Sequence, residues 1–150
     1  METVMQRIKL HEGFRKKVYK DTLNKRTVGY GHLCVEDYWE DGKEYTVAEL
    51  DKVFEKDFHK AENAASKLYK ECNIDKKAKE IIIEMVFQLG PSGVSKFKRM
   101  WKMLKINPPD YEMAANEMLD SRWAHQTPSR AKELSNIMRG IIQWQQEHHD

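Results

Sequence analysis

The sequence predicts an α+β fold in which helices are segregated from one small antiparallel sheet. Residues 14–45 are rich in β-branched, aromatic and turn-forming residues, as short paired strands are. A capping box at Thr46 opens a long helical pattern, and residues 75–150 carry helical periodicity interrupted by prolines. The chain of 150 residues fits one domain, 1–150, made of two lobes. We expect a small β lobe over about 14–45, a connecting helix over about 46–68, and a helical lobe formed by 1–13 plus 75–150.

The first element should be a short helix that ends beside a glycine. Apolar residues recur at helical spacing up to Leu10, and Gly13 is a suitable stop. Glu12 then falls in the last turn. In the following region, Asp21 to Asn24 reads as a turn between two short strands, and Asp41-Gly42 is a second turn signal.

Helix signals dominate after the sheet. Thr46 with Glu49 three residues later forms the capping box. Asp75 should cap a strongly apolar helix over Lys76–Leu89, which Gly90-Pro91 ends. The remainder reads as several short helices, with Thr127 as the expected N-cap before Pro128. A cleft between the two lobes is the natural place for a ligand.

Composition sets broad limits on the class of protein. Hydrophobic residues make up 40% and charged residues 33%, which is typical of a soluble globular chain. No apolar run approaches the ~18 residues of a membrane span, and the N-terminus lacks a secretory signal pattern. The thiols of Cys34 and Cys72 are expected to be free. The net charge of +2 is too small to indicate nucleic acid. A local basic stretch suits either an anionic partner or a solvated face: Arg15, Lys16, Lys17, Lys20, Lys25 and Arg26.

Glu12, Asp21 and Thr27 are the candidate catalytic residues. If the hairpin folds back over the end of the first helix, all three face one cleft. Glycoside hydrolysis needs one carboxylic acid to protonate the leaving oxygen and one carboxylate to act at the anomeric carbon or on water. Their spacing alone equally fits ordinary surface carboxylates, because the chain has 24 acidic residues.

Three sequence blocks resemble the T-even phage lysozyme family, the endolysins among the glycoside hydrolases. The first is E-G-F-R-K-K-V-Y-K-D-T followed by T-V-G-Y-G-H-L, which is similar to the active-site segment of that family. The second, M-V-F-Q-L-G over Met85 to Gly90, resembles its central helix. The third, S-R-W-A-H-Q-T-P-S-R-A-K over Ser121 to Lys132, resembles its C-terminal signature. The three blocks occur in the family's order and span most of the chain, so a lysozyme-like fold is expected.

The resemblance implies roles for individual residues. Glu12 matches the catalytic acid, Asp21 the second carboxylate, and Thr27 the threonine that helps to hold the attacking water, in a reaction thought to invert the anomeric carbon. Leu33, Phe87 and Asn116 fall at sugar-contacting positions, and Met100 stands where a serine is usual. Arg130 matches an arginine that pairs with the acid and tunes it. His32 and Asp57 match an ion pair, so a structural role is favoured for them over catalysis.

The resemblance also implies a biological setting. The implied activity is that of a muramidase acting on peptidoglycan glycan strands, without a cofactor and without a metal. We expect a monomer that stays in the host cytoplasm until a holin or another pore releases it to the wall for host lysis. We expect no membrane insertion and no nucleic-acid partner. A metal site from His11, His32 and His59 is disfavoured, since their spacing matches no ligand motif.

Two alternatives to an enzyme remain open at this stage. One is a non-catalytic binder of cell wall that retains an enzyme fold. The other is a nucleic-acid-binding protein that uses the basic stretch between Arg15 and Arg26, although no recognition motif supports it.

Several features depart from the family pattern. The segment between His32 and Thr46 is shorter and more acidic. Glu84 replaces a neutral amide, and Glu133 stands where a basic residue is usual close to Arg130, where it is expected to weaken the pairing of Arg130 with Glu12. Trp39, within the shortened segment, fits either a loop residue folded onto the β lobe or a sugar-stacking platform.

Overall fold

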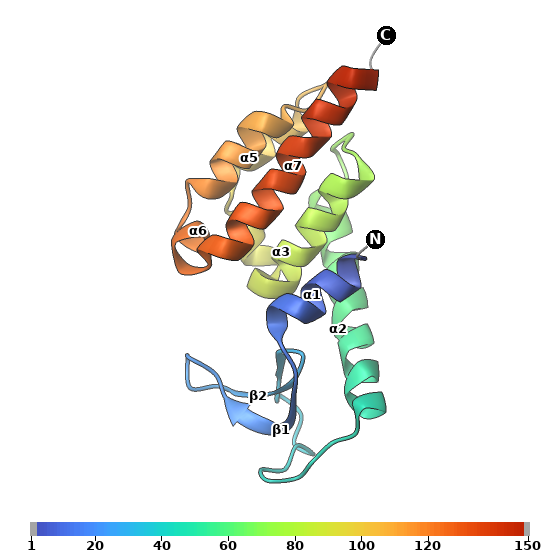
Figure 1. Cartoon of the computed structure of the whole chain (residues 1–150), viewed down its shortest axis with the longest axis vertical. Coiled ribbons are helices and arrows are strands. Elements are labelled where there is room, and N and C mark those ends of the chain that lie inside the picture. Colours follow the sequence, from blue (N-terminus) through green and yellow to red (C-terminus); the bar gives the residue numbers. More distant parts are fainter. Residues whose placement is uncertain (1–2, 149–150) are drawn as a thin grey trace. The chain divides into compact units, whose positions relative to one another are not determined.

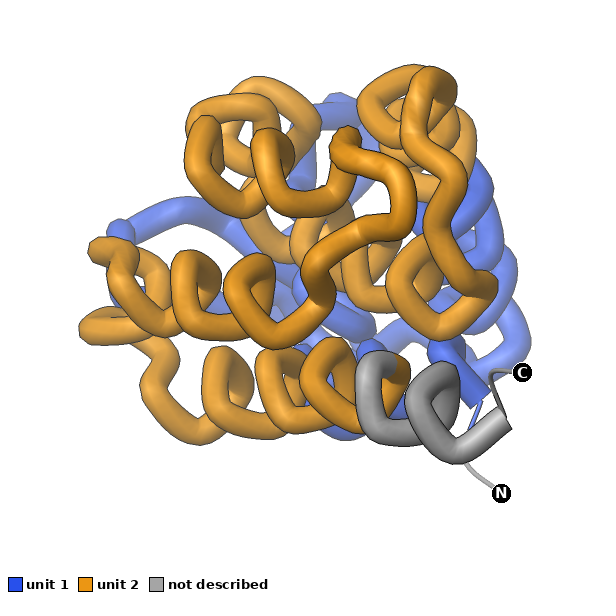
Figure 2. Tube along the Cα trace, turned by 90° about the horizontal axis from the view of Figure 1, so that it is seen from above, with its two compact units in different colours: residues 1–60 blue, residues 61–150 orange. Residues whose placement is uncertain are grey.

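The computed structural model describes residues 3–148, with the side chains of residues 3–141, and confirms the α+β class. The chain separates into two compact units, one ending at Lys60 and the other beginning at Ala61 (Figures 1 and 2). Helix α2 (Val47–Leu68) runs through this boundary. The first unit contains the sheet and helix α1 (Val4–Glu12). The predicted lobe boundaries stay predictions, because they depend on how the two units meet. This includes the assignment of residues 1–13 to the helical lobe.

Helix α1 is defined by local signals at both ends. The Thr3 hydroxyl accepts a hydrogen bond from the backbone N–H of Gln6, and the Gln6 side chain accepts one from the backbone N–H of Thr3. This capping box satisfies two N–H groups that a helix start leaves without partners. Gly13 ends the helix at a φ of 74°, and its N–H donates to the Lys9 carbonyl. Glu12 is therefore the last residue of α1, as predicted.

The sheet is antiparallel, in the order β1-β2-β3. Its strands are β1 (Arg15–Lys20), β2 (Arg26–Gly29) and β3 (His32–Leu33). The β1–β2 turn forms at Asp21–Asn24, as predicted, with Asn24 at a φ of 62°. Residues 34–46 contain no strand, so the sheet fills only the first part of the predicted 14–45 region.

The segment 34–46 is held by a small core and by ion pairs instead of strand pairing. Trp39 is only 6% exposed and belongs to a cluster with Val28, Tyr45 and Leu50. Its indole packs edge-on against Tyr45, with ring centroids 4.9 Å apart. Trp39 is therefore a loop residue folded onto the sheet, and its ring is not exposed as a sugar platform.

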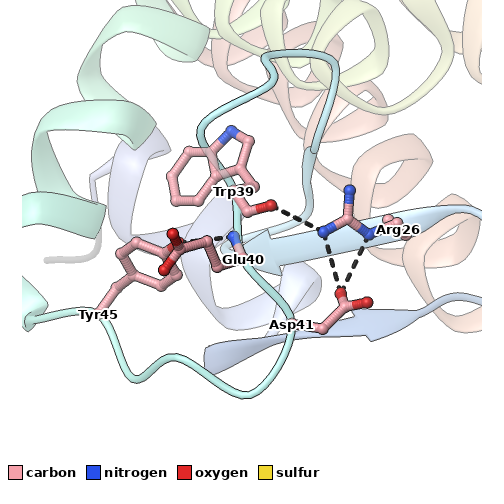
Figure 3. A network of polar contacts seen from close by, with 5 residues as sticks. All are labelled: Arg26, Trp39, Glu40, Asp41 and Tyr45. Atoms are coloured by element: carbon pink, nitrogen blue, oxygen red, sulfur yellow. Dashed lines mark hydrogen bonds and ion pairs between the residues drawn. The ribbon is translucent and has the colours of Figure 1, made fainter.

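Arg26, on strand β2, forms hydrogen bonds with the segment 34–46 (Figure 3). Its Nη2 donates to the Trp39 carbonyl at 2.9 Å, and its Nε and Nη2 lie 3.1 and 3.0 Å from Asp41 Oδ1. The Tyr45 hydroxyl accepts from the Glu40 N–H at 2.9 Å. These bonds give the irregular backbone partners that a sheet would otherwise have provided.

Helix α2 begins where the capping box predicts. The Glu49 N–H donates to the Thr46 hydroxyl at 3.1 Å, and that hydroxyl donates to Glu49 Oε1 at 3.2 Å. The Glu49 carboxylate thus meets the cap side chain, whereas the usual capping box uses the cap backbone N–H. One face of the helix is buried at helical spacing: Leu50, Phe54, Phe58, Ala61 and Ala65.

The second unit is helical throughout its regular structure. Its elements are α3 (Lys76–Ser95), α4 (Lys98–Lys105), α5 (Tyr111–Leu119), α6 (Arg122–Gln126) and α7 (Pro128–His148). Asp75 caps α3 by accepting from the Lys77 N–H, as predicted. Gly90 breaks α3 at a φ of 79°, so the predicted stop is a kink after which a short helical segment continues.

The C-terminal helices differ in part from the prediction. Pro128 is the first residue of α7, and the Thr127 carbonyl accepts from the Ala131 N–H at 3.0 Å, so Thr127 holds the predicted N-cap position. The Thr127 hydroxyl donates to the Trp123 carbonyl at 3.0 Å, in the preceding helix α6. Helix α7 is also longer than the short pieces expected, and it runs alongside α5 (Figure 1). Cys34 and Cys72 are free and partly buried. Within residues 3–148, no helix combines the length and apolar character needed to cross a membrane.

Replacing Trp39 by alanine should destabilise the protein by about 3 kcal/mol, because it empties the centre of the first unit's core. Tyr38→Ala is the matched control: Tyr38 is 59% exposed and touches only the edge of the same cluster, so its loss should cost about 1 kcal/mol or less. Urea unfolding measures both values. Equal losses would contradict the placement of Trp39 in the core.

Candidate active site

Glu12 lies at the end of α1, against the turn that joins β2 to β3. Its side chain is half-buried. A Cβ atom added at Gly31 would stand 2.6 Å from Glu12 Oε1, so the carboxylate rests directly on this glycine. Gly31 also has a φ of +75°, which L side chains rarely adopt. The backbone of one tight turn therefore sets the position of the predicted acid.

Asp21 is held by the turn that follows β1. Its Oδ1 accepts hydrogen bonds from the backbone N–H groups of Leu23 and Lys25, both at 2.9 Å. Two such bonds on one oxygen fix the orientation of the carboxylate. The second oxygen, Oδ2, has no part in these turn contacts.

Thr27 occupies the middle of the sheet. It is 3% exposed, and its register partners are Tyr19 on β1 and Leu33 on β3. Its hydroxyl donates to the Lys25 carbonyl at 3.0 Å. Since that bond uses the only hydroxyl proton, the oxygen can serve the site as an acceptor.

Tyr19 links the three candidate residues. Burial raises the pKa of Tyr19, the Arg15 guanidinium lowers it, and the charges of Glu12 and Asp21 both raise it further. Both carboxylates are thus close enough to act on the same phenol, and Thr27 pairs with Tyr19 across the strands. Glu12, Asp21 and Thr27 therefore all lie in the first unit, and their joint role stays a prediction. The sequence indicated close backbone packing or a tight bend at Gly31 but not its contact with Glu12, and it did not indicate Tyr19 as a site residue; the position of Tyr19 two residues before Asp21 on a strand was the available signal.

The predicted sugar-contacting residues lie in different surroundings. Leu33 is 43% exposed and sits beside Thr27 in the sheet. In the second unit, Phe87 is half-buried on α3 and Met100 is 1% exposed. Asn116 is exposed, and its Oδ1 accepts from Arg139 Nη2 at 2.6 Å. The structure places Leu33 beside Thr27, and the contribution of all four residues to sugar binding stays a prediction.

Arg130 forms a buried ion pair with Glu84. Its Nε lies 2.8 Å from Glu84 Oε2, and the two side chains are 9% and 0% exposed. The sequence led us to expect that Glu133 competes with Glu12 for Arg130. The structure shows a bond from Arg130 Nε to Glu84. A guanidinium has five N–H donors and can hold more than one partner. The predicted pairing of Arg130 with Glu12 joins the two units and stays a prediction.

His32 lies between two carboxylates. Its Nδ1 is 2.8 Å from Asp57 Oδ2, and its Nε2 is 2.9 Å from Glu36 Oε1, which also accepts from Trp39 Nε1 at 2.7 Å. Carboxylates only accept hydrogen bonds, so both ring nitrogens must donate and the ring is protonated in this arrangement. The bond to Asp57 and, to a smaller extent, that to Glu36 raise the pKa of His32, while burial opposes them. The bonds from His32 and Trp39 lower the pKa of Glu36 to about 2. The predicted His32–Asp57 ion pair thus forms, and Glu36 extends it.

Part of the basic stretch of the first unit has structural partners. Arg26 binds Asp41 and Trp39, the Arg15 guanidinium stacks 4.7 Å from the centre of the Tyr19 ring, and Lys16 lies 4.0 Å from Glu44. These contacts leave less positive charge for a nucleic-acid partner than the sequence alone indicates.

A half-buried carboxyl group at a helix end, a second carboxylate in a turn and a buried hydroxyl in the sheet are groups that glycoside hydrolysis can use. The family model described as phage lysozyme matches residues 9–141. The chain therefore belongs to the phage lysozyme family and is a glycoside hydrolase of the lysozyme class.

Curated relatives agree with this family. The chain is 30% identical to probable T4-type lysozyme 1 of Dictyostelium discoideum, with 92% of this chain and 94% of that protein aligned. It is 31% identical to probable T4-type lysozyme 2 of the same organism, with 87% and 89% aligned. It is also 28% identical to the pre-baseplate central spike protein Gp5 of Enterobacteria phage T4, aligned to 91% of this chain but to 27% of that longer protein.

Gly31→Ala should damage activity more than stability. The added Cβ would push the flexible end of Glu12 away, so we expect activity on cell walls to fall about tenfold or more. Gly42→Ala is the control, because Gly42 has a φ of +83° but no atom within 4 Å of an added Cβ. Both variants should lose about 1 kcal/mol of stability from backbone strain, and only the first should lose activity. Equal activity in the two would contradict the contact between Gly31 and Glu12.

The His32 network should make stability depend on pH at both ends. A raised His32 pKa contributes stability that is complete below its ordinary value of 6.5 and is lost as pH rises through the raised value. A lowered Glu36 pKa contributes stability that is present above its ordinary value of 4.5 and is lost as pH falls toward about 2. The combined contribution should therefore be largest between pH 4.5 and 6.5.

Urea unfolding of Glu36→Gln across the pH range measures this contribution. The variant should lose the acidic decline and keep a weaker alkaline one, because Asp57 still faces His32. Glu40→Gln, an exposed change in the same segment, should keep the full profile. A Glu36→Gln profile that overlays that of the unaltered protein would show that this network does not contribute.

Proposed function

We propose that the protein is a muramidase that hydrolyses the β-1,4 bond between N-acetylmuramic acid and N-acetylglucosamine in peptidoglycan. The observation that supports this proposal is that Thr27 pairs with Tyr19 across the strands, while the charges of Glu12 and Asp21 both raise the pKa of Tyr19. Membership of the phage lysozyme family and the names of the lysozyme relatives point to the same substrate.

In the proposed mechanism, Glu12 protonates the glycosidic oxygen as the bond to the anomeric carbon breaks. Asp21 accepts a proton from a water molecule through Oδ2, while the turn holds its Oδ1. Thr27 accepts a second hydrogen bond from this water, because its own proton is donated to Lys25. Water attacks the face opposite the leaving oxygen, so the anomeric configuration inverts. The carboxylates suffice for this chemistry, and no step needs a metal or a cofactor.

The proposed substrate contacts extend from this centre. Leu33 lies beside Thr27 and offers an exposed apolar surface to a sugar ring. Phe87, Met100 and Asn116 are proposed to contact the strand from the second unit. We further propose that the protein is a monomer held in the host cytoplasm until a holin or another pore lets it reach the peptidoglycan of the cell wall, where it lyses the host.

Glu12→Gln should lower the rate of peptidoglycan cleavage by about a thousandfold or more and leave the fold intact, because an amide cannot give up a proton to the leaving oxygen. Glu55→Gln, an exposed change on α2, is the control and should keep full activity. Turbidity loss of a cell-wall suspension measures the rate. A Glu12→Gln variant as active as the control would refute the assignment.

The products separate this reaction from its alternatives. Mass spectrometry of digested peptidoglycan should find muramic acid at the new reducing ends, and proton magnetic resonance of the first products should find the inverted anomer. Cleaved peptide cross-links would show that the protein is an amidase or peptidase and not a muramidase. Retention of the anomeric configuration would contradict the inverting mechanism but not the muramidase activity.

A further inference from the structure

Helix α4 in the second unit carries an unusual concentration of positive charge. No acidic residue occurs between Glu84 and Asp110, whereas Lys96, Lys98, Arg99, Lys102 and Lys105 all fall in this interval. All five side chains are exposed. Lys98, Lys102 and Lys105 follow the spacing i, i+4, i+7, so they share one face of the helix.

This face borders a hollow of about 450 Å³, which we call the α4 hollow. It is lined by Leu68, Ser95, Lys98, Trp101, Lys102 and Lys105. The Trp101 indole is 6% exposed, and its Nε1 donates to the Val94 carbonyl at 2.9 Å, so the ring presents only apolar surface. Three ammonium groups and one hydroxyl thus surround an apolar floor, and no lining residue is acidic.

The positive charges of the α4 hollow lack compensation. None of its three lysines forms an ion pair with a residue that the structure describes. Glu71 is an acidic residue near Lys105, since both act on the Cys72 thiol: Lys105 lowers the pKa of Cys72 and Glu71 raises it. The first turn of α4 has no acidic residue, and Phe97 at the N-cap gives no side-chain bond. Lys98 stands in the first turn of α4, where a cation destabilises a helix, whereas Lys102 and Lys105 stand in the last turn, where the helix dipole favours cations. Lys98 and Lys102, four residues apart, repel each other, and a bound anion would relieve this repulsion.

A second hollow on the same helix shows what distinguishes this site. It measures about 560 Å³ and is also lined by Lys96, Lys98 and Arg99, but Glu117 and Asp120 line it too. Its mixed charge suits no single sign of ligand. The α4 hollow, lined by lysines alone among charged residues, selects anions.

We propose that the α4 hollow binds the phosphate groups of a linear polyol-phosphate polymer of the bacterial cell envelope. Ammonium groups bind phosphate as point charges, and the Ser95 hydroxyl can donate to its oxygens. The three lysines extend over about 10 Å of helix, longer than one phosphate, so a chain of phosphates matches them better than a single ion. The large apolar residues of α4, namely Met100, Trp101 and Leu104, are buried, so the helix offers no anchor for a lipid bilayer.

The choice of an envelope polymer rests on the proposed function, which brings the protein to the bacterial wall. Such a site would keep the enzyme close to its substrate between cleavage events and raise the local concentration of glycan. The anion selectivity of the hollow itself rests only on the residues that line it.

Binding of soluble poly(glycerol phosphate), measured by the fluorescence anisotropy of the labelled polymer, tests the proposal. The double variant Lys102→Gln/Lys105→Gln should bind about tenfold more weakly, and the salt dependence of its binding should be shallower. The control Lys76→Gln/Lys77→Gln removes the same charge from exposed positions at the start of α3 and should change affinity by less than about twofold. Lys98→Gln should weaken binding about threefold by the same argument.

Equal losses of affinity in the double variant and its control would contradict the proposed site and indicate general electrostatic attraction to the protein surface. Tighter binding to anionic phospholipid vesicles or to duplex DNA than to the polymer would overturn the choice of ligand. The test is independent of catalysis: Glu12→Gln should bind the polymer as well as the unaltered protein. On peptidoglycan stripped of phosphate polymers, the double variant should be as active as the unaltered protein. If neither the unaltered protein nor the variants cleave this peptidoglycan, the proposed function is refuted, whereas the binding result still stands.

Discussion

The pairing of Tyr19 with Thr27 across β1 and β2 is the interaction on which the site depends. Side chains alternate between the two faces of a strand, so a slip of one residue would turn Thr27 to the face opposite Tyr19. The turn at Asp21 fixes this register through its bonds to Leu23 and Lys25, and the same bonds orient the Asp21 carboxylate. One short hairpin therefore sets both the strand register and the position of a functional group.

Strand β2 serves two purposes because its residues face opposite ways. Thr27 lies on the face of the sheet that carries Tyr19, whereas Arg26, its neighbour, binds Asp41 and the Trp39 carbonyl (Figure 3). A sheet of three short strands buries little apolar surface and needs further packing to be stable. The segment 34–46 supplies that packing by placing Trp39 over Val28 and Leu50. Stability of the site thus depends on a segment that contributes no residue to the chemistry.

Local signals in the sequence predicted the helix boundaries well. Gly13 ends α1, Thr46 and Asp75 cap their helices, and Gly90 breaks α3, because each acts on backbone groups within a few residues of itself. Contacts between distant residues could not be predicted in this way. The Glu84–Arg130 bond joins positions 46 residues apart, and Gly31 meets Glu12 only once the sheet has folded. The resemblance to known lysozymes supplied the identities of the candidate residues, whereas spacing alone left Glu12 and Asp21 indistinguishable from surface carboxylates.

The acidity of the segment between His32 and Thr46 has a structural explanation. Glu36 accepts hydrogen bonds from both His32 and Trp39, and Asp41 pairs with Arg26. Both carboxylates connect the irregular segment 34–46 to the sheet, Glu36 through His32 on β3 and Asp41 through Arg26 on β2. A shorter connection with fewer backbone hydrogen bonds needs stronger individual contacts, and charge-assisted bonds provide them. Because the bonds of Glu36 and His32 depend on protonation, they link the stability of the first unit to pH.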